Sequence, residues 1–181
     1  MSGGCPTARE RRADYELIMH GASLYQRFAA TPLCEGLTDD EVSALFELCE
    51  QRAFEPSAAV FTEGQPGDAL WIILEGDVEV SRDGAVLAEV GPGAALGELS
   101  LLRETPTRSA TARALCKVVA VRLPTTAFRK RLLVNDVAAL KVVSNLAHQL
   151  ADRLVALNDR LLSGGRKGLA VARTELRRLV R

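Results

Sequence analysis

Residues 97–111 read Gly-Glu-Leu-Ser-Leu-Leu-Arg-Glu-Thr-Pro-Thr-Arg-Ser-Ala-Thr and carry the clearest chemical signal in the chain. The pattern predicts a short helical turn over Glu98–Leu102 that opens at a glycine between two strands. The free backbone N–H groups and the positive dipole end of such a turn attract an anion. Arg108 can add a bidentate, charge-assisted grip on two phosphate oxygens, and Ser109 can add a hydroxyl donor. The stretch therefore predicts a phosphate site.

Glu98 needs a different partner, because a carboxylate repels a phosphate. It suits this place if it accepts a hydrogen bond from a nearby ribose hydroxyl. One arginine beside one helix N-terminus fits a singly charged diester better than a triphosphate, which usually requires a P-loop and a metal ion. The glycines at 91, 93 and 97 superficially resemble a dinucleotide fingerprint, but no βαβ unit surrounds them. Turn formation explains them better.

Short strand-like runs flank this stretch on both sides. Asp83-Gly84 between two apolar runs is a strong hairpin signal, and Trp71 is expected in the core. Strands this short and evenly spaced favour an antiparallel roll over βαβ units. We expect strands at Ala59–Thr62, Ala69–Leu74, Val78–Ser81, Val86–Val90, Arg108–Ala114 and Cys116–Leu123.

Helical patterns lie at both ends of the strand region. A helix is expected over Ala13–Ala30, and Thr38 with Glu41 forms a capping box before a second helix. The apolar face of that second helix comprises Val42, Leu45, Phe46 and Cys49.

From Thr125 onward the chain is predicted to be helical again, ending at Ser163-Gly164-Gly165. An unbroken a/d register runs along this helix through Leu140, Val143, Ala147, Leu150, Leu154, Leu157 and Leu161. The stripe suits either packing on the roll or pairing with a second copy, and we favour pairing.

These elements predict an α+β fold: an antiparallel, jelly-roll-like β-roll of eight strands with flanking N-terminal helices and a long C-terminal helix. Residues 1–32 are expected to form a disordered segment and a helix. The roll is expected over residues 33–135, a dimerisation or lid helix over 136–162, and a basic tail over 163–181.

Composition limits the functional classes. Lys and Arg total 23 in the 181 residues, as do Asp and Glu, so no overall field favours nucleic acid or membranes. His20 and His148 are far apart and lack companions at ligand spacing, so no metal site is expected. No catalytic motif is present, and we expect a protein that is not an enzyme.

The expected location is the cytoplasm, because the chain shows no signal peptide and no apolar stretch of bilayer length. The cysteines form no C-x-x-C pair, and we expect small apolar residues in a reducing compartment. They are Cys5, Cys34, Cys49 and Cys116.

The stretch from Gly97 to Thr111 resembles the phosphate-binding cassette of cyclic-nucleotide-binding domains, the family that includes the catabolite activator protein. Phe61–Gly76 resembles the early β-roll of that family, and Val90–Gly93 leads into the cassette as it does in relatives. The resemblance extends over about Leu33–Leu161.

The resemblance implies that Glu98 holds the ribose 2′-hydroxyl and that Arg108 pairs with the cyclic phosphate, helped by Ser109. Serine at position 109 implies cyclic AMP, because family members that prefer cyclic GMP often have threonine there. Thr111 leaves cyclic GMP open, since it could meet a guanine edge. The implied backbone donors and base contacts are Gly97, Leu99 and Ala110 for the phosphate, and Thr111 and Asn158 for the base.

The function implied is a regulatory module that binds a cyclic nucleotide, with no other cofactor, and signals to a separate effector protein through its C-terminal helix. A homodimer through Leu140–Leu161 is expected. About 20 residues follow Leu161, too few for a helix-turn-helix DNA-binding domain. Two alternatives remain: a scaffolding protein that no longer binds ligand, and a nucleic-acid regulator acting through the basic residues of Arg166–Arg181.

Overall fold

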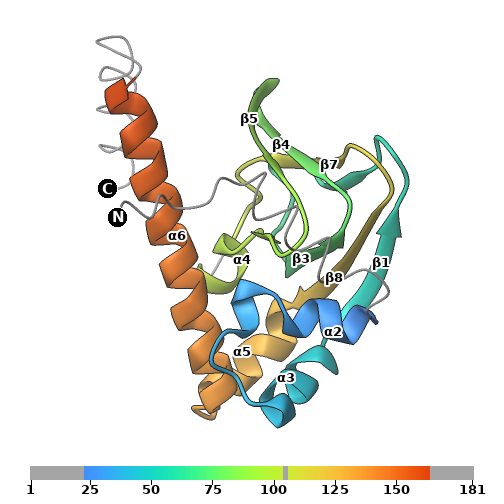
Figure 1. The fold of residues 1–181 in the computed structure, drawn as a ribbon, viewed down its shortest axis with the longest axis vertical. Coiled ribbons are helices and arrows are strands. Elements are labelled where there is room, and N and C mark those ends of the chain that lie inside the picture. Colours follow the sequence, from blue (N-terminus) through green and yellow to red (C-terminus); the bar gives the residue numbers. More distant parts are fainter. Residues whose placement is uncertain (1–22, 104–105, 164–181) are drawn as a thin grey trace, which may run out of the picture. The chain divides into compact units, whose positions relative to one another are not determined.

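The computed structural model describes residues 23–103 and 106–163, and within them eight strands form two four-stranded antiparallel sheets (Figure 1). The strand orders are β1-β8-β3-β6 and β2-β7-β4-β5. The predicted α+β fold with a β-roll is confirmed. The strands are β1 (Glu50–Phe54), β2 (Ala59–Phe61), β3 (Ala69–Glu75), β4 (Val78–Arg82), β5 (Ala85–Val90), β6 (Ala95–Leu96), β7 (Thr111–Ala114) and β8 (Val118–Pro124).

The core of the roll lies between the two sheets. Trp71 and Ile73 of β3 point into it, together with residues of β2, β4, β6, β7 and β8. The other face of β3 carries Leu70 and Ile72, which are also fully buried. Helices cover that face, so β3 is apolar from Ala69 to Leu74 rather than alternating (Figure 1).

The hairpin predicted at Asp83-Gly84 is confirmed. It joins β4 to β5, and both turn residues have positive φ, 49° for Asp83 and 78° for Gly84. Two consecutive residues with positive φ form the type I′ turn, whose twist matches that of the flanking strands.

The sequence pattern does not predict strands β1 and β6, and a third strand begins later than predicted. β1 is Glu-Gln-Arg-Ala-Phe, largely polar and exposed, and it exists because it pairs with β8 along its whole length. β6 has only two residues, which pair with Trp71 and Ile72. The strand expected over Arg108–Ala114 begins only at Thr111, so Arg108 and Ser109 lie in the preceding loop.

The described N-terminal part contains α2 (Leu24–Ala29), the 3-10 helix η1 (Pro32–Cys34) and α3 (Asp39–Phe46). The predicted capping box of α3 is confirmed: the Thr38 N–H donates to Glu41 Oε2 at 2.8 Å, and the Glu41 N–H donates to Thr38 Oγ1 at 3.3 Å. Cys49 lies beyond the end of α3, so its predicted place on that helical face is wrong. Residues 13–22 of the expected first helix lie outside the described part.

The C-terminal helical region is divided into α5 (Thr125–Leu133) and α6 (Val137–Ser163). The break falls at Asn135, whose φ of 55° is left-handed. Asp136 then caps α6 by accepting the Ala139 N–H at 2.9 Å. The prediction of continuous helix from Thr125 is therefore wrong at this one turn.

The chain divides into two compact units, residues 1–142 and 143–181, and the boundary falls within the sequence of α6. In the first unit, Lys141 ties the helix to α3 through an ion pair of 2.7 Å with Glu41. Ala138, Ala139 and Val142 are buried there, whereas Leu140 of the predicted stripe is 49% exposed. Leu140, the stripe residue that lies in this unit, is therefore not on the face of the helix that packs there.

Within the described ranges, no helix combines the length and apolar character that a bilayer crossing requires.

The cysteines differ sharply in environment. Burial raises the pKa of the Cys34 thiol to about 11 and that of Cys49 to about 12, whereas Cys116 is exposed. Because the thiolate is the reactive form, we expect Cys116 to be alkylated at least about 100-fold faster than Cys34 or Cys49 near neutral pH. Peptide mass spectrometry of the folded Cys5→Ser protein measures the rates. Alkylation of Cys34 as fast as that of Cys116 would contradict the burial seen here.

Candidate functional site

Arg108 is placed by backbone hydrogen bonds to the loop between β2 and β3. Its N–H donates to Gln65 O at 2.8 Å, and its carbonyl accepts the Gly64 N–H at 2.8 Å. The Gly67 N–H donates to Pro106 O at 2.7 Å. These bonds clamp two loops together and fix the position from which the Arg108 side chain extends.

Arg108 is buried, with only 5% of its surface exposed, and three side chains hold its guanidinium. Nη1 donates to Ser100 Oγ at 2.9 Å, and Nη2 donates to Asp68 Oδ1 at 3.3 Å. Cζ lies 4.3 Å from the centre of the Phe61 ring, a cation–π contact. Burial lowers the pKa of Arg108 and Asp68 opposes that shift, but an arginine keeps its charge at neutral pH.

The predicted helical turn is confirmed as α4 (Leu99–Leu102), with Glu98 at its N-cap. Gly97 precedes it with a φ of 77°, and a Cβ at this position would collide with Nη1 of Arg108. A Cβ on Gly67 would likewise collide with the Ser100 hydroxyl. Glycine at position 97 lets the start of α4 approach the buried arginine, and glycine at position 67 lets the loop before β3 approach α4.

Asp68 connects Arg108 to a second arginine. Its Oδ2 lies 2.6 Å from Nη2 of Arg122 on β8, and Arg122 Nη1 lies 3.2 Å from Glu50 Oε1 on β1. Partial burial would raise the pKa of Asp68, but the hydrogen bond and charge of Arg122, with the charge of Arg108, hold that pKa below its usual value. The carboxylate is thus ionised at neutral pH.

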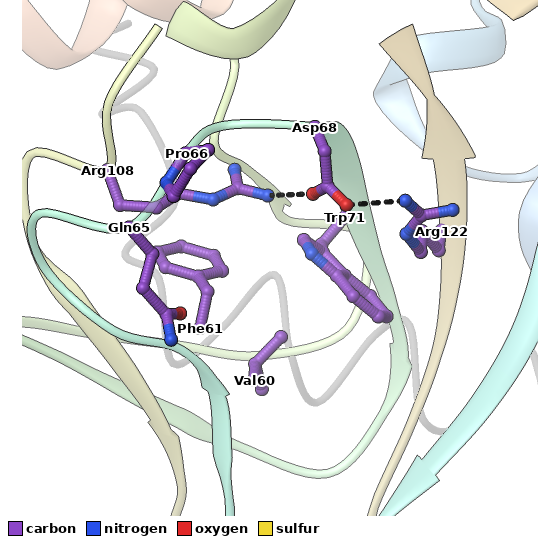
Figure 2. A pocket seen from close by; sticks show the side chains of 8 residues that line it. All are labelled: Val60, Phe61, Gln65, Pro66, Asp68, Trp71, Arg108 and Arg122. Carbon is purple, nitrogen blue, oxygen red and sulfur yellow. Dashed lines mark hydrogen bonds and ion pairs between the residues drawn. The ribbon is translucent and has the colours of Figure 1, made fainter. Parts of the chain in front are cut away.

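A cavity of about 390 Å³ opens beside this network (Figure 2). Arg108, Asp68 and Arg122 form its charged wall, and the rest is formed by Gln65 and by aromatic and apolar side chains. Of the residues predicted to bind ligand, only Arg108 lines it. The lining residues are Val60, Phe61, Gln65, Pro66, Asp68, Trp71, Arg108 and Arg122.

The other predicted residues lie around α4 and in the loop before β7. Gly97, Glu98 and Leu99 are half-buried at the start of α4. Ser109 is exposed, whereas Ala110 is buried. The structure therefore brings Gly97 against Arg108 and leaves the Ser109 side chain accessible.

The two predicted base contacts are placed differently. Thr111 is half-buried, and its Oγ1 accepts the Glu63 N–H at 3.0 Å, so this hydroxyl holds the loop after β2. Asn158 is exposed on α6 in the second compact unit. A contact of either residue with a base stays a prediction.

Four residues that surround Arg108 were not predicted as site residues: Phe61, Asp68, Ser100 and Arg122. The first three lie inside stretches that resemble the family, so that resemblance could have identified them as candidates. No sequence signal marks Arg122, because it is one charged residue in an otherwise apolar strand. Among the described residues, no group of three His, Cys, Asp or Glu side chains is arranged to hold a metal ion.

A β-roll that holds a buried arginine against a helical turn opened by a glycine is an arrangement that can bind a small phosphate-bearing ligand. Residues 51–135 match the family described as "Cyclic nucleotide-binding domain". The β-roll of this chain belongs to that family, which is regulatory rather than catalytic.

Known proteins agree with this assignment. A cyclic nucleotide-binding domain from Methylobacillus flagellatus has a TM-score of 0.70 and 26% identity, over 78% of this chain and 84% of that one. The CRP-like cAMP-activated global transcriptional regulator of Mycobacterium tuberculosis is 30% identical over 138 residues, 74% of this chain and 59% of that protein.

Glutaminase 1 of Bradyrhizobium diazoefficiens is 34% identical over 160 residues. The match covers 86% of this chain but only 26% of that protein, so the chain spans about a quarter of this relative.

Proposed function

We propose that the domain binds cyclic AMP and that Arg108 pairs with the cyclic phosphate. The observation that carries the proposal is the buried guanidinium, which three side chains orient against the turn that opens at Gly97. A guanidinium already fixed in place loses little side-chain entropy when an anion arrives. The family assignment supports a cyclic nucleotide as the source of that anion.

The remaining roles follow the cassette. We propose that Ser109, whose side chain is exposed, donates its hydroxyl to the phosphate, and that Glu98 accepts a hydrogen bond from the ribose 2′-hydroxyl. Backbone N–H groups of Gly97, Leu99 and Ala110 would complete the set of donors. Thr111 and Asn158 remain the proposed base contacts.

The proposal is tested by calorimetric titration of the folded protein with cyclic AMP and cyclic GMP. We expect one saturable site that binds cyclic AMP at least about tenfold more tightly, a difference of about 1.4 kcal/mol. Ser109→Thr should reduce this preference, with Ser43→Thr, at an exposed serine of α3, as the matched control. Failure of both nucleotides to bind the folded, ligand-free protein would contradict the proposal and favour the scaffolding alternative.

We further propose that binding is read out through α6. Ser100 accepts a hydrogen bond from Arg108, and its carbonyl accepts one at 3.3 Å from Arg129 of α5, which also donates to Arg103 O. Arg131 of α5 in turn pairs with Asp136, the cap of α6, at 3.1 Å. A ligand that prefers one arrangement of this series would shift the population of α6 positions.

A homodimer through the leucine stripe of α6 is part of this proposal. Leu140, Leu154 and Leu157 are between 46% and 52% exposed, which leaves the stripe accessible to a second copy. The effector protein, the cytoplasmic location and the division into segments 1–32, 33–135, 136–162 and 163–181 also stay predictions. The basic tail lies outside the described residues.

The similarity to glutaminase 1 favours a second candidate for the output. It spans 160 residues, more than the 85 of the family match at 51–135, and so includes sequence outside the matched roll. We propose that the regulated partner is an enzyme of the glutaminase class, linked to the domain or separate from it. Glutaminase activity that responds to cyclic AMP only when the domain is present would support this candidate.

A further inference from the structure

Asp68 is shared by two arginines, and its two ion pairs are unequal. Oδ2 lies 2.6 Å from Nη2 of Arg122, whereas Oδ1 lies 3.3 Å from Nη2 of Arg108. Figure 2 shows the carboxylate between the two guanidinium groups. Since the strength of a charge-assisted hydrogen bond falls with its length, the carboxylate interacts more strongly with Arg122.

Arg122 is well placed to hold this carboxylate. Its side chain is 21% exposed and projects from β8, and its second nitrogen pairs with Glu50 on the neighbouring strand β1 at 3.2 Å. A planar guanidinium held by two carboxylates has little freedom to rotate. Asp68 itself has a side chain that is 63% exposed and depends on such a partner for a fixed position.

The position of Asp68 matters to Arg108 because a carboxylate and a phosphate compete for the same donors. A bidentate pair with Asp68 would occupy both outer nitrogens of Arg108 and cancel its charge. In the structure only Oδ1 reaches Arg108, and it does so at the longer distance. Nη1 of Arg108 is directed instead to Ser100 in the turn after Gly97.

We propose that Arg122 is a positioning residue for phosphate binding: it keeps Asp68 from forming a bidentate pair with Arg108, so the Arg108 charge stays available to the ligand. The inference rests on the proposed function. Arg122 lies outside the cassette, and in this proposal it acts on phosphate binding through Asp68.

The test is a double-mutant cycle read by titration with cyclic AMP. Arg122→Ala should weaken binding about tenfold, because Asp68 then pairs fully with Arg108. Asp68→Asn alone should change affinity by less than about threefold, since Arg108 keeps its charge. The double variant should return to within about threefold of the wild type, because the competing carboxylate is gone.

Arg52→Ala is the matched control. Arg52 lies on β1 and pairs with the same Glu50 at 2.8 Å, but no ion pair joins it to Asp68. We expect unchanged affinity. Arg122→Gln keeps most of the side-chain length and replaces Arg122→Ala if that variant shows a lower folded fraction in a thermal melt. We expect Arg122→Gln to weaken cyclic AMP binding to the same extent, and Asp68→Asn to restore it.

The outcomes separate the two proposals. Equal affinity of the wild type and a folded Arg122 variant would overturn the positioning role and leave the proposed function standing. A double variant as weak as the single Arg122 variant would do the same, because loss of packing would then explain the effect. A wild type that binds neither cyclic nucleotide would overturn both.

Discussion

Arg108→Ala is expected to weaken cyclic AMP binding by at least about 100-fold, since each charge-assisted hydrogen bond to a buried ligand contributes about 1.5–3 kcal/mol and a bidentate pair has two. The guanidinium is the buried cation that three side chains direct against the turn after Gly97. Arg108→Lys keeps the charge but loses the planar fork, so an intermediate loss is expected. Calorimetric titration measures both.

The control for this prediction must separate lost binding from lost folding. Arg108→Ala removes a partner from Asp68, but Asp68 stays paired with Arg122, so no isolated charge is left in the site. We therefore expect a folded variant, checked by thermal unfolding. Arg113→Ala, an exposed arginine on β7 that donates to Ser57 O, should bind as the wild type does. A folded Arg108→Ala protein that binds within about threefold of the wild type would remove the phosphate role from Arg108.

Gly97→Ala is expected to weaken cyclic AMP binding by about 10–100-fold and to destabilise the fold by more than the about 1–2 kcal/mol that a left-handed alanine costs. The new Cβ would occupy the place of Arg108 Nη1, so either the arginine or the turn must move. Displacing the arginine breaks its bond to Ser100 and misdirects its charge. Denaturant unfolding and titration measure the two effects.

Gly84→Ala is a matched control for backbone strain. Gly84 has a φ of 78°, against 77° for Gly97, but a Cβ there has no atom within 4 Å. Both substitutions carry the same conformational cost, and only Gly97→Ala creates a collision. Gly84→Ala should therefore lose about 1–2 kcal/mol of stability and bind normally. Equal losses of stability and unchanged binding in both variants would show that glycine is needed at position 97 only for its backbone conformation.

Structural features that form between residues close together in the sequence could be predicted from the sequence. The capping box of Thr38 and Glu41, the Asp83-Gly84 turn and the helical turn after Gly97 all form between residues a few positions apart. Their geometry follows from local hydrogen bonds and backbone preferences, so the pattern specifies it before any packing occurs. The resemblance to the cassette added Glu98, Arg108 and Ser109 as a set.

Structural features that depend on pairing between segments far apart in the sequence could not be predicted from it. β1 has no apolar alternation, and only its partner β8 makes it a strand. Arg108 was expected inside a strand, but its backbone bonds go to the loop at Gln65, which holds it out of the sheet. Hydrogen bonds to a distant loop thus outweighed the local strand pattern.

The sequence by itself determined the fold class and the helical turn after Gly97, and it predicted Arg108 as the phosphate-binding residue, because these depend on local spacing and on a motif whose members lie close together. Only the tertiary structure decided what orients that arginine. Asp68 lies 40 residues from Arg108 and 54 from Arg122, and neither separation has a period that a pattern could reveal. The three charges meet because β3, β8 and the loop before β7 fold together, and the short Asp68–Arg122 contact exists only once the sheet is formed.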